Sequence, residues 1–279
     1  MTEDSRLAPC YLLHESGVPC VVWFEDALAY YGVPTALFQL YILVLDIEAA
    51  AQSLVRRGWI EVVQQQSTVG NATFNGAQRC LTPPGYESQP DRPLVNPSNT
   101  EPRHPRPRPP PPSSKPPGPT KTLLLLAAEW NYSLLNHTTK VSNPLKEAFF
   151  PPLAGLLDAL IDSLLDAPFD NDFLQRHLVC YISYLYMHVP LLKDPSFARF
   201  LKADHRQYHL DSLSGMNTGS VAFISHQIRI REAIRNGTYQ QRECSATRDD
   251  ESLFTDKSQA KLLAQLNMRR LRDSERNDA

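Results

Sequence analysis

Short apolar runs alternate with amphipathic segments along the first eighty residues. Three of the runs combine β-branched and aromatic residues and therefore predict strands; they are 19–23 (PCVVW), 35–44 (TALFQLYILV) and 59–63 (WIEVV). Two amphipathic segments between them predict helices, the first over 25–32 and the second over 47–58. Strands and helices that alternate over short loops predict a small sheet with helices packed against it.

Both predicted helices carry signals at their ends. Glu25 and Asp26 place negative charge in the first turn of the first helix, and Gly32 follows its last turn. Asp46 stands where the second helix needs an N-cap, and Gly58 stands at its end. The apolar residues of the second helix recur at the i, i+3, i+4, i+7 spacing that gives a helix one apolar face.

The region after residue 120 has a different pattern, because one apolar run is followed by long helical segments. The run KTLLLLAA at 121–128 predicts a buried strand, with a helix as the alternative. The helical patterns cover 152–167, 173–189, 196–213 and 225–237. The segment 173–189 is apolar on almost every side, so we expect it to be buried.

Residues 83–119 contain fifteen of the 24 prolines. Proline has no backbone N–H to donate, so this segment predicts a disordered, polyproline-rich insert. The predicted domains are 1–80, the N-terminal half of an α/β core; 81–120, the insert; 121–240, the last core strand and a helical region; and 241–279, a charged tail, partly helical or disordered.

The apolar runs on the two sides of the insert each lack enough strand partners to be stable alone. We therefore expect them to share one sheet. The predicted fold class is α+β, with a small mixed sheet, flanking helices and a helical C-terminal region.

Composition narrows the function classes. The 279 residues are 42% hydrophobic, enough for a sizeable core, and their net charge is −2. A balanced charge gives no field that attracts nucleic acid or an anionic membrane surface. No long apolar stretch typical of a signal peptide opens the sequence, and the five cysteines are scattered without zinc spacing. We expect an intracellular protein, cytoplasmic or nuclear, with no membrane span.

The stretch VVWFEDALAYYGVPTALFQLYILV at 21–44 resembles the core of the nucleotidyltransferase superfamily. In that pattern a strand runs into a Gly-Gly or Gly-Ser pair, a helix follows, and the next strand carries Asp-x-Asp. The chain is also similar to uncharacterised fungal proteins that have a Pro-rich insert and a region like HLVCYISYLY followed by DHRQYHLDSLSGM, here within 177–216. The resemblance implies a nucleotidyltransferase-like core, and the fungal set implies no activity.

The chemistry of nucleotidyl transfer is missing at the matching positions. Mg²⁺ prefers carboxylate oxygens, and two carboxylates at i and i+2 of a strand share one face. Gln39 and Tyr41 occupy those two positions, and neither offers an anionic oxygen at neutral pH. Phe24 and Glu25 occupy the glycine pair, so a bulky ring and a negative charge stand where phosphate would approach.

Two histidine patterns are candidate sites. His205 and His209 lie at i, i+4 with Asp204 and Asp211 nearby, a spacing that suits zinc, but no third ligand is evident. A polar helix face with histidines bonded to neighbours is the favoured interpretation.

The segment 173–189 adds three candidates, His177, Cys180 and His188. His177 and Cys180 could form a dyad, but a reactive thiol needs exposure and an orienting group, so core packing is favoured. The aromatic series Tyr181, Tyr184 and Tyr186 is likewise interpreted as packing.

The sequence thus predicts a non-catalytic, nucleotidyltransferase-like protein that binds a ligand or partner, with no catalytic residue, no metal ligand and no cofactor. One alternative is an active Mg²⁺-dependent nucleotidyltransferase that uses carboxylates elsewhere, namely Asp46, Glu61 or Glu129. The other is an interaction scaffold, because RPRPPPP at 106–112 fits the Arg-x-x-Pro-x-x-Pro spacing bound by SH3-type domains.

Overall fold

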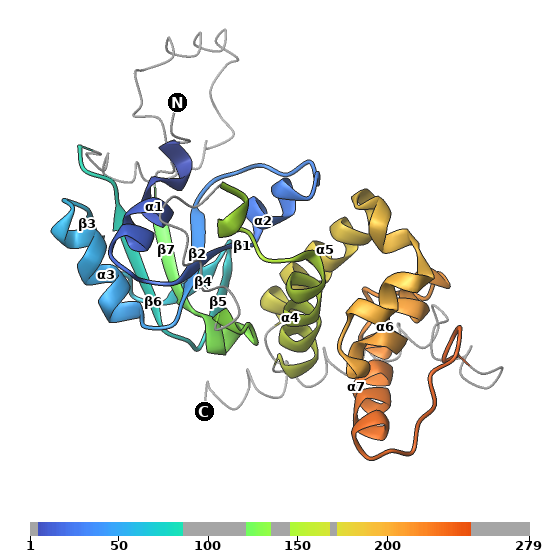
Figure 1. Ribbon diagram of the computed structural model, residues 1–279. Helices are drawn as coiled ribbons and strands as arrows, with labels where there is room; N and C mark the ends of the chain where they lie inside the picture. The colour runs from blue at the N-terminus through green and yellow to red at the C-terminus, as the bar shows by residue number, and fades with distance from the viewer. Residues whose placement is uncertain (1–4, 86–120, 135–145, 168–171, 247–279) are drawn as a thin grey trace, which may run out of the picture.

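A computed structural model of the chain describes residues 5–85, 121–134, 146–167 and 172–246. In this part of the chain a β-sheet with two helices on its outer face lies beside a larger helical region (Figure 1). Most of the predicted insert, including the segment 106–112, and the tail from residue 247 lie outside the described residues. The expectations for those segments stay predictions.

Five strands form one mixed sheet. Their order across the sheet is β1-β2-β7-β6-β3, and their bounds are Cys20–Trp23, Leu40–Val44, Thr122–Leu126, Gln78–Thr82 and Ile60–Val62. The pair β2 and β7 is parallel, and the other three pairs are antiparallel. A mixed sheet with flanking helices confirms the α+β fold class.

The central strand β7 follows the insert, whereas both of its neighbours precede it. Leu40 of β2 pairs with Thr122 on one side, and Leu81 of β6 pairs with Thr122 on the other. The prediction that strands from both sides of the insert share one sheet is therefore confirmed. The two ends of the insert leave the sheet at adjacent positions of an antiparallel pair.

The alternation of side chains divides the sheet into two buried faces. Leu40, Ile42 and Val44 of β2 face α1 (Ala8–Glu15) and α3 (Ile47–Arg56). The predicted N-cap of α3 is confirmed, because Asp46 accepts hydrogen bonds from the N–H groups of Glu48 and Ala49. The buried apolar residues on this face are Leu7, Cys10, Leu13, Cys20, Val22, Leu40, Ile42, Val44, Ile47, Ala50, Ala51, Leu54, Trp59, Leu81, Leu124, Phe149 and Phe150.

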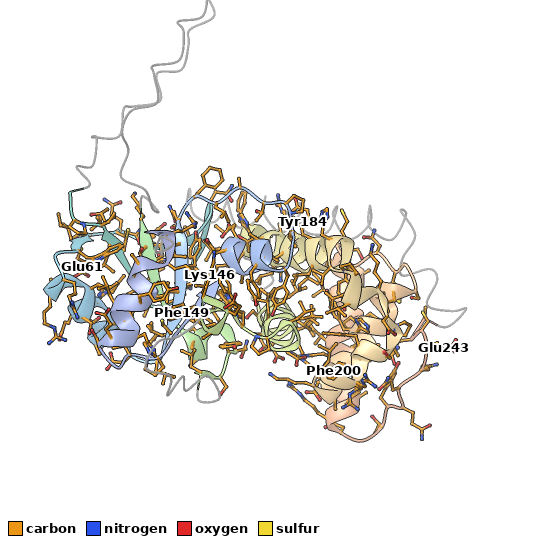
Figure 2. All side chains as sticks on the ribbon, turned by 45° about the horizontal axis from the view of Figure 1, so that its top comes forward. Glu61, Lys146, Phe149, Tyr184, Phe200 and Glu243 are labelled. Carbon is orange, nitrogen blue, oxygen red and sulfur yellow. The ribbon has the colours of Figure 1, made fainter. Side chains whose placement is uncertain are left out.

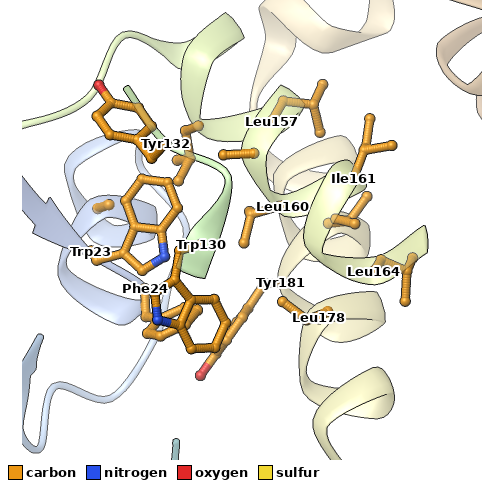
Figure 3. Close-up of a cluster of buried hydrophobic side chains, with 14 of the residues drawn as sticks. Trp23, Phe24, Trp130, Tyr132, Leu157, Leu160, Ile161, Leu164, Leu178 and Tyr181 are labelled. Atoms are coloured by element: carbon orange, nitrogen blue, oxygen red, sulfur yellow. The ribbon is translucent and has the colours of Figure 1, made fainter. Parts of the chain in front are cut away.

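The opposite face packs against the helical region. Tyr41 and Leu43 of β2 point to this side, where they meet α2 (Glu25–Tyr30), the short 3₁₀ helix η2 (Ala127–Trp130), α4 (Leu153–Asp166) and α5 (Asp172–His188). Figure 3 shows the aromatic part of this core, with Trp23, Phe24, Trp130 and Tyr181 beside the leucines of α4 and α5. Two further helices, α6 (Ala203–Leu213) and α7 (Val221–Arg235), extend the helical region beyond α4.

Several predicted boundaries are wrong. The strand predicted from residue 35 begins only at Leu40, because residues 35–39 form an irregular segment after Pro34. The helix predicted over 196–213 is divided into η6 (Pro195–Phe200) and α6, and the Lys202 N–H at the division donates to Asp158 of α4. Helix α7 begins at Val221, four residues earlier than the pattern predicts. The Ser220 hydroxyl caps it by accepting a hydrogen bond from the N–H of Phe223.

The pattern also misses several elements. These are η1 (Ser5–Leu7), α1, β6, the hairpin β4 (Ser67–Val69) and β5 (Ala72–Phe74), η4 (Lys146–Phe149) and η5 (Pro190–Lys193). Most are three to five residues long, too short for a periodic signal.

The prediction that 173–189 is buried on all sides is wrong. One face of α5 lies in the core through Leu174, Leu178 and Leu185, but Tyr184 is 43% exposed and Met187 is 59% exposed. Figure 2 shows Tyr184 at the surface of α5. The segment has two different faces that its uniform apolar composition conceals.

One described stretch, Lys146–Asp166, is long and apolar enough to cross a membrane by length and composition alone. In the folded chain, 72% of its most apolar window is buried against the rest of the protein. Burial of this kind is what a core helix shows, and α4 is indeed the helix on which the aromatic cluster packs.

Candidate functional site

The candidate site lies where the sheet meets the helical region, at the amino end of β2. Gln39 and Tyr41 project from the same face of the chain there, as i and i+2 positions should. The Tyr41 hydroxyl donates to Oε1 of Gln39 at 3.2 Å and accepts from the N–H of Gly70 at 3.0 Å. The two residues that the sequence resemblance aligns with metal-binding positions are thus bonded to each other, and Tyr41 is also bonded to the hairpin β4–β5.

The turn of this hairpin closes over the site. Gly70 has φ +58°, which favours glycine at the first central position of a two-residue turn. A Cβ at Gly70 would lie 2.8 Å from Cε1 of His177, so the imidazole ring would have to move to admit any other residue. The next residue, Asn71, accepts at Oδ1 from Nε2 of His177 over 2.6 Å when that nitrogen is protonated. The hairpin is therefore fixed to β2 and to α5 at the same time.

Phe24, which the sequence resemblance aligns with the first residue of a glycine pair, lies between β1 and α2. Its backbone has φ 51° and ψ −126°, a region that glycine adopts readily and other L-residues rarely adopt. Its ring is 1% exposed and packs edge-to-face on Tyr41 at 5.2 Å and on Trp130 at 4.9 Å. The ring of Tyr181 lies 5.2 Å away on another side (Figure 3). Aromatic packing keeps a strained backbone conformation that a glycine would adopt without strain.

Glu25 follows Phe24 and points to the same buried region. Its Oε1 accepts from the Tyr181 hydroxyl at 2.7 Å, while its buried Oε2 has no hydrogen-bond partner among the described residues. Burial raises the pKa of Glu25, against the lowering effect of the bond from Tyr181. The carboxyl group belongs to a polar contact between α2 and α5 and is held away from the solvent.

Burial also raises the pKa values of the two phenols of the site, Tyr41 and Tyr181. It raises the pKa of Tyr41 to about 12, against the bond from Gly70. It raises the pKa of Tyr181 further, and the neighbouring Glu25 charge adds to the effect. Both phenols stay protonated at neutral pH, so they act as neutral hydrogen-bonding groups and supply no anionic metal ligand.

The three carboxylates of the enzyme alternative do not meet at Gln39. Asp46 follows the carboxyl end of β2 and caps α3. Glu61 of β3 lies opposite Leu81, whose side chain is on the α1 and α3 face of the sheet, so Glu61 points away from the Tyr41 side. Figure 2 shows Glu61 at the far side of the sheet from the helical region.

Glu129 lies beyond the carboxyl end of β7. Both of its oxygens accept from the N–H of Ala77, at 3.0 and 3.2 Å. Gln39, in contrast, stands at the amino end of the parallel pair, next to the Leu40–Thr122 register. The length of the strand separates the two side chains.

The His205 of the zinc-like pattern is a buried ion-pair centre. It is 0% exposed, with Nδ1 2.7 Å from Asp158 and Nε2 2.9 Å from Asp162. Burial alone would lower its pKa, but the two carboxylates outweigh burial and raise it. Burial likewise opposes the charge of Asp162, yet His205 and Lys202 hold the pKa of that carboxyl well below its usual range.

The remaining members of that pattern have separate partners. His209 bonds to the Tyr186 hydroxyl at 2.9 Å and to the backbone oxygen of Asp194 at 3.1 Å. Asp204 pairs with Arg235 at 2.6 Å near the surface. Asp211 is fully buried and accepts hydrogen bonds from Gln207, Gln227 and Ser245. The structure therefore does not bring His205 and His209 together as ligands.

The candidates on α5 are also dispersed. His177 bonds to Asn71, whereas Cys180 and His188 lie on the exposed face. Tyr181 and Tyr186 use their hydroxyls in buried polar bonds, so the interpretation of these tyrosines as packing residues alone was incomplete. Tyr184 points to the surface.

Sequence reasoning missed the hairpin turn and the role of Trp130. The Gly70–Asn71 pair was the available signal, because such dipeptides mark tight turns between strands. Trp130 gave no local signal, since its role comes from contact with Phe24, a residue over a hundred positions away in the sequence.

Among the described residues, no group of three or more histidine, cysteine, aspartate or glutamate side chains is placed to hold a metal ion. Comparison of the chain with family models, with curated proteins and with solved structures finds no match. The geometry of the chain's own residues is therefore the basis for the function proposed below.

Proposed function

We propose that the chain is a binding module built on a nucleotidyltransferase-like frame that no longer transfers nucleotides. The observation that carries the proposal is the buried Phe24 ring at the first glycine position. The ring fills the space between β1, Tyr41 and Trp130. The order strand, turn, helix, strand over Cys20–Val44 fits the family outline, and the backbone at Phe24 keeps a glycine-like conformation.

The replacement of the metal-binding positions supports the same proposal independently. Tyr41 and Gln39 are committed to bonds with each other and with Gly70. Mg²⁺ bridging of phosphate oxygens needs anionic ligands, and the three alternative carboxylates Asp46, Glu61 and Glu129 lie away from Gln39 and Tyr41. A well-packed fold that lacks both the metal-binding carboxylates and the phosphate-binding glycines can still bind a ligand or a partner protein, but it cannot transfer a nucleotide.

Titration calorimetry of the full chain with Mg²⁺-ATP tests the proposal. We expect no saturable heat at millimolar nucleotide, with or without Mg²⁺. A saturable, Mg²⁺-dependent signal would overturn the non-catalytic assignment and favour the enzyme alternative.

A double variant makes the test sharper. Gln39→Asp with Tyr41→Asp restores two carboxylates, but it also removes a buried ring and two hydrogen bonds, so the variant should melt lower than the wild type. Added Mg²⁺ should not recover the melting temperature, because a protein that binds no metal gains no stability by linkage. A rise in melting temperature with Mg²⁺ in the double variant alone would identify the strand as a metal platform.

A further inference from the structure

A second feature of the same junction is a cleft of about 230 Å³ between η2, the turn after β5, and helices α4 and α5. Its apolar wall consists of Phe74, Trp130, Leu174 and Leu178. The rings of Phe74 and Trp130 meet at 68° with their centroids 5.3 Å apart, so the cleft contains an aromatic corner. Trp130 also packs on Phe24, which places the cleft directly beside the filled cradle.

Two buried polar groups of the cleft wall have no partner among the described residues, namely the Ser163 hydroxyl and the indole Nε1 of Trp130. The hydroxyl of Ser163 on α4 is buried and makes no hydrogen bond with any described residue. The residue is 9% exposed, and buried polar atoms in proteins are almost always paired. Both atoms have almost no accessible surface, so they lie behind the wall of the cleft, and the charge and the aromatic groups of the lining determine which ligand it prefers.

The charge of the lining determines which ligands fit. Among the described residues, the lining includes the carboxylates Glu129 and Asp166 and no lysine, arginine or histidine. Asp166 is neutralised by Arg231, whose Nη2 lies 2.6 Å from Oδ1. Glu129 is exposed and accepts only from the backbone of Ala77; no ion-pair partner for it occurs in the described part of the chain. The described part of the lining thus carries one negative charge without an ion-pair partner, beside an aromatic corner.

We propose that this cleft binds a small organic cation, a protonated amine on an apolar or aromatic body. This inference rests on the proposed binding function and names its site and ligand class. The ammonium group lies at Glu129 and over the aromatic corner, where a carboxylate and ring faces both attract a cation. The body lies against Leu174 and Leu178. The volume is below that of sites for drug-sized ligands, and fits a body of about ten non-hydrogen atoms.

Three indole derivatives of nearly equal size test the charge preference. Tryptamine carries a cation, tryptophol is neutral, and indole-3-acetate carries an anion. In calorimetric titrations of the full chain, tryptamine should bind saturably, tryptophol about tenfold more weakly, and indole-3-acetate not at all up to about 10 mM. Equal binding of tryptamine and indole-3-acetate, or no saturable binding of tryptamine, overturns the proposal.

Two variants locate the site. Glu129→Gln keeps an acceptor for Ala77 but removes the charge, so tryptamine affinity should fall about fivefold while tryptophol affinity stays unchanged. Glu243→Gln is the matched control, because Glu243 is an exposed carboxylate at the far end of the helical region (Figure 2). Unchanged tryptamine affinity in Glu129→Gln, or an equal loss in the control, overturns the placement. Thermal melts confirm that both variants fold.

The same protein sample separates this inference from the proposed function. Saturable Mg²⁺-ATP binding would contradict the non-catalytic proposal, whatever the amines do. Absence of tryptamine binding together with absence of Mg²⁺-ATP binding would contradict only the assignment of this cleft.

Discussion

The Nε2 atom of His205 lies 2.9 Å from Oδ1 of Asp162, and the imidazole has no exposed surface. The other ring nitrogen contacts Asp158 on the previous turn of α4. Two ionised carboxylates can only accept, so both ring nitrogens donate when His205 is a cation. Lys202 and Arg231 also bind Asp162, and the group joins α4, α6 and α7.

Removing the imidazole should destabilise the helical region strongly. His205→Gln leaves two largely buried carboxylates with less compensation, so we expect the free energy of unfolding to fall by about 3 kcal/mol. Urea denaturation measures this loss. The control is Asp204→Asn, which breaks only the exposed pair with Arg235 and should cost less than about 1 kcal/mol. Similar losses in the two variants would show that the buried network contributes no more to the free energy of unfolding than an exposed ion pair does.

The same network predicts a pH dependence with a definite sign. The pKa of His205 is raised above its ordinary value of 6.5, so its contribution is fully present below pH 6.5 and is lost as the pH rises through the folded-state pKa. The pKa of Asp162 is lowered from 3.8, so its contribution is present above pH 3.8 and is lost at lower pH.

The stability difference between wild type and His205→Gln should therefore be largest between these values and should narrow at alkaline pH. Denaturation midpoints recorded from pH 4 to pH 9 give this difference. A difference that grows above pH 7 would mean that the buried imidazole is neutral in the folded protein.

At Phe24 a glycine variant should be more stable than an alanine variant, the reverse of the order found in regular secondary structure. Both variants lose the ring and should lose about 3 to 5 kcal/mol of stability for the cavity. Glycine adopts φ 51° without strain, so Phe24→Gly should be more stable than Phe24→Ala by about 1 kcal/mol. At Leu54, inside helix α3, the alanine variant should be the more stable by a similar amount. If the alanine variant were the more stable one at both positions, the backbone at Phe24 would not be strained.

Shortening the insert should leave the sheet intact. Deletion of 84–118 leaves four residues between Thr82 and Thr122, the end of β6 and the start of β7, in place of the 39 now present. Since Leu81 already pairs with Thr122, a short hairpin loop suffices. The entropy of loop closure favours the variant by roughly 2 kcal/mol, which offsets strain in the new turn.

The melting temperature of the deletion variant should stay within a few degrees of the wild-type value. Collapse of the fold would mean that the insert supports the sheet. The variant also tests the scaffold alternative, because a partner that binds through 106–112 would be lost while the fold remains.

Local sequence signals predicted the parts of the fold whose cause is local. Helix α3 begins directly after Asp46, as predicted, because the Asp46 side chain accepts from N–H groups of the first turn and the residues that follow form one apolar face. The β-branched and leucine runs predicted β2 and β7 as buried strands. That both strands belong to one sheet could be expected only from the argument that each needs partners, and their parallel pairing was not predicted, because no residue in either strand encodes its neighbour.

The candidate site was predicted at the level of positions and not of contacts. The sequence placed Phe24, Glu25, Gln39 and Tyr41 in one region, as the structure does. The bonds that connect this region to Tyr181, His177 and Gly70 involve residues up to 156 positions away, so periodicity cannot indicate them. The mistaken burial of α5 has the same origin, since composition alone does not tell which side of an apolar helix meets the core.

The placement of β7 between β2 and β6 also bears on how the chain is made. Val44 completes β2, and Leu126 completes the partner strand 82 residues later. At about 5 to 20 residues per second, translation needs roughly 4 to 16 s to supply that strand. Throughout this interval β2 presents an open backbone edge, and β6 presents one from the completion of Thr82 onward, the feature by which nascent strands associate wrongly. We therefore expect the yield of folded protein in a cell to depend on how well these edges are shielded on the ribosome, and slower translation of residues 83–121 to lengthen the period of exposure.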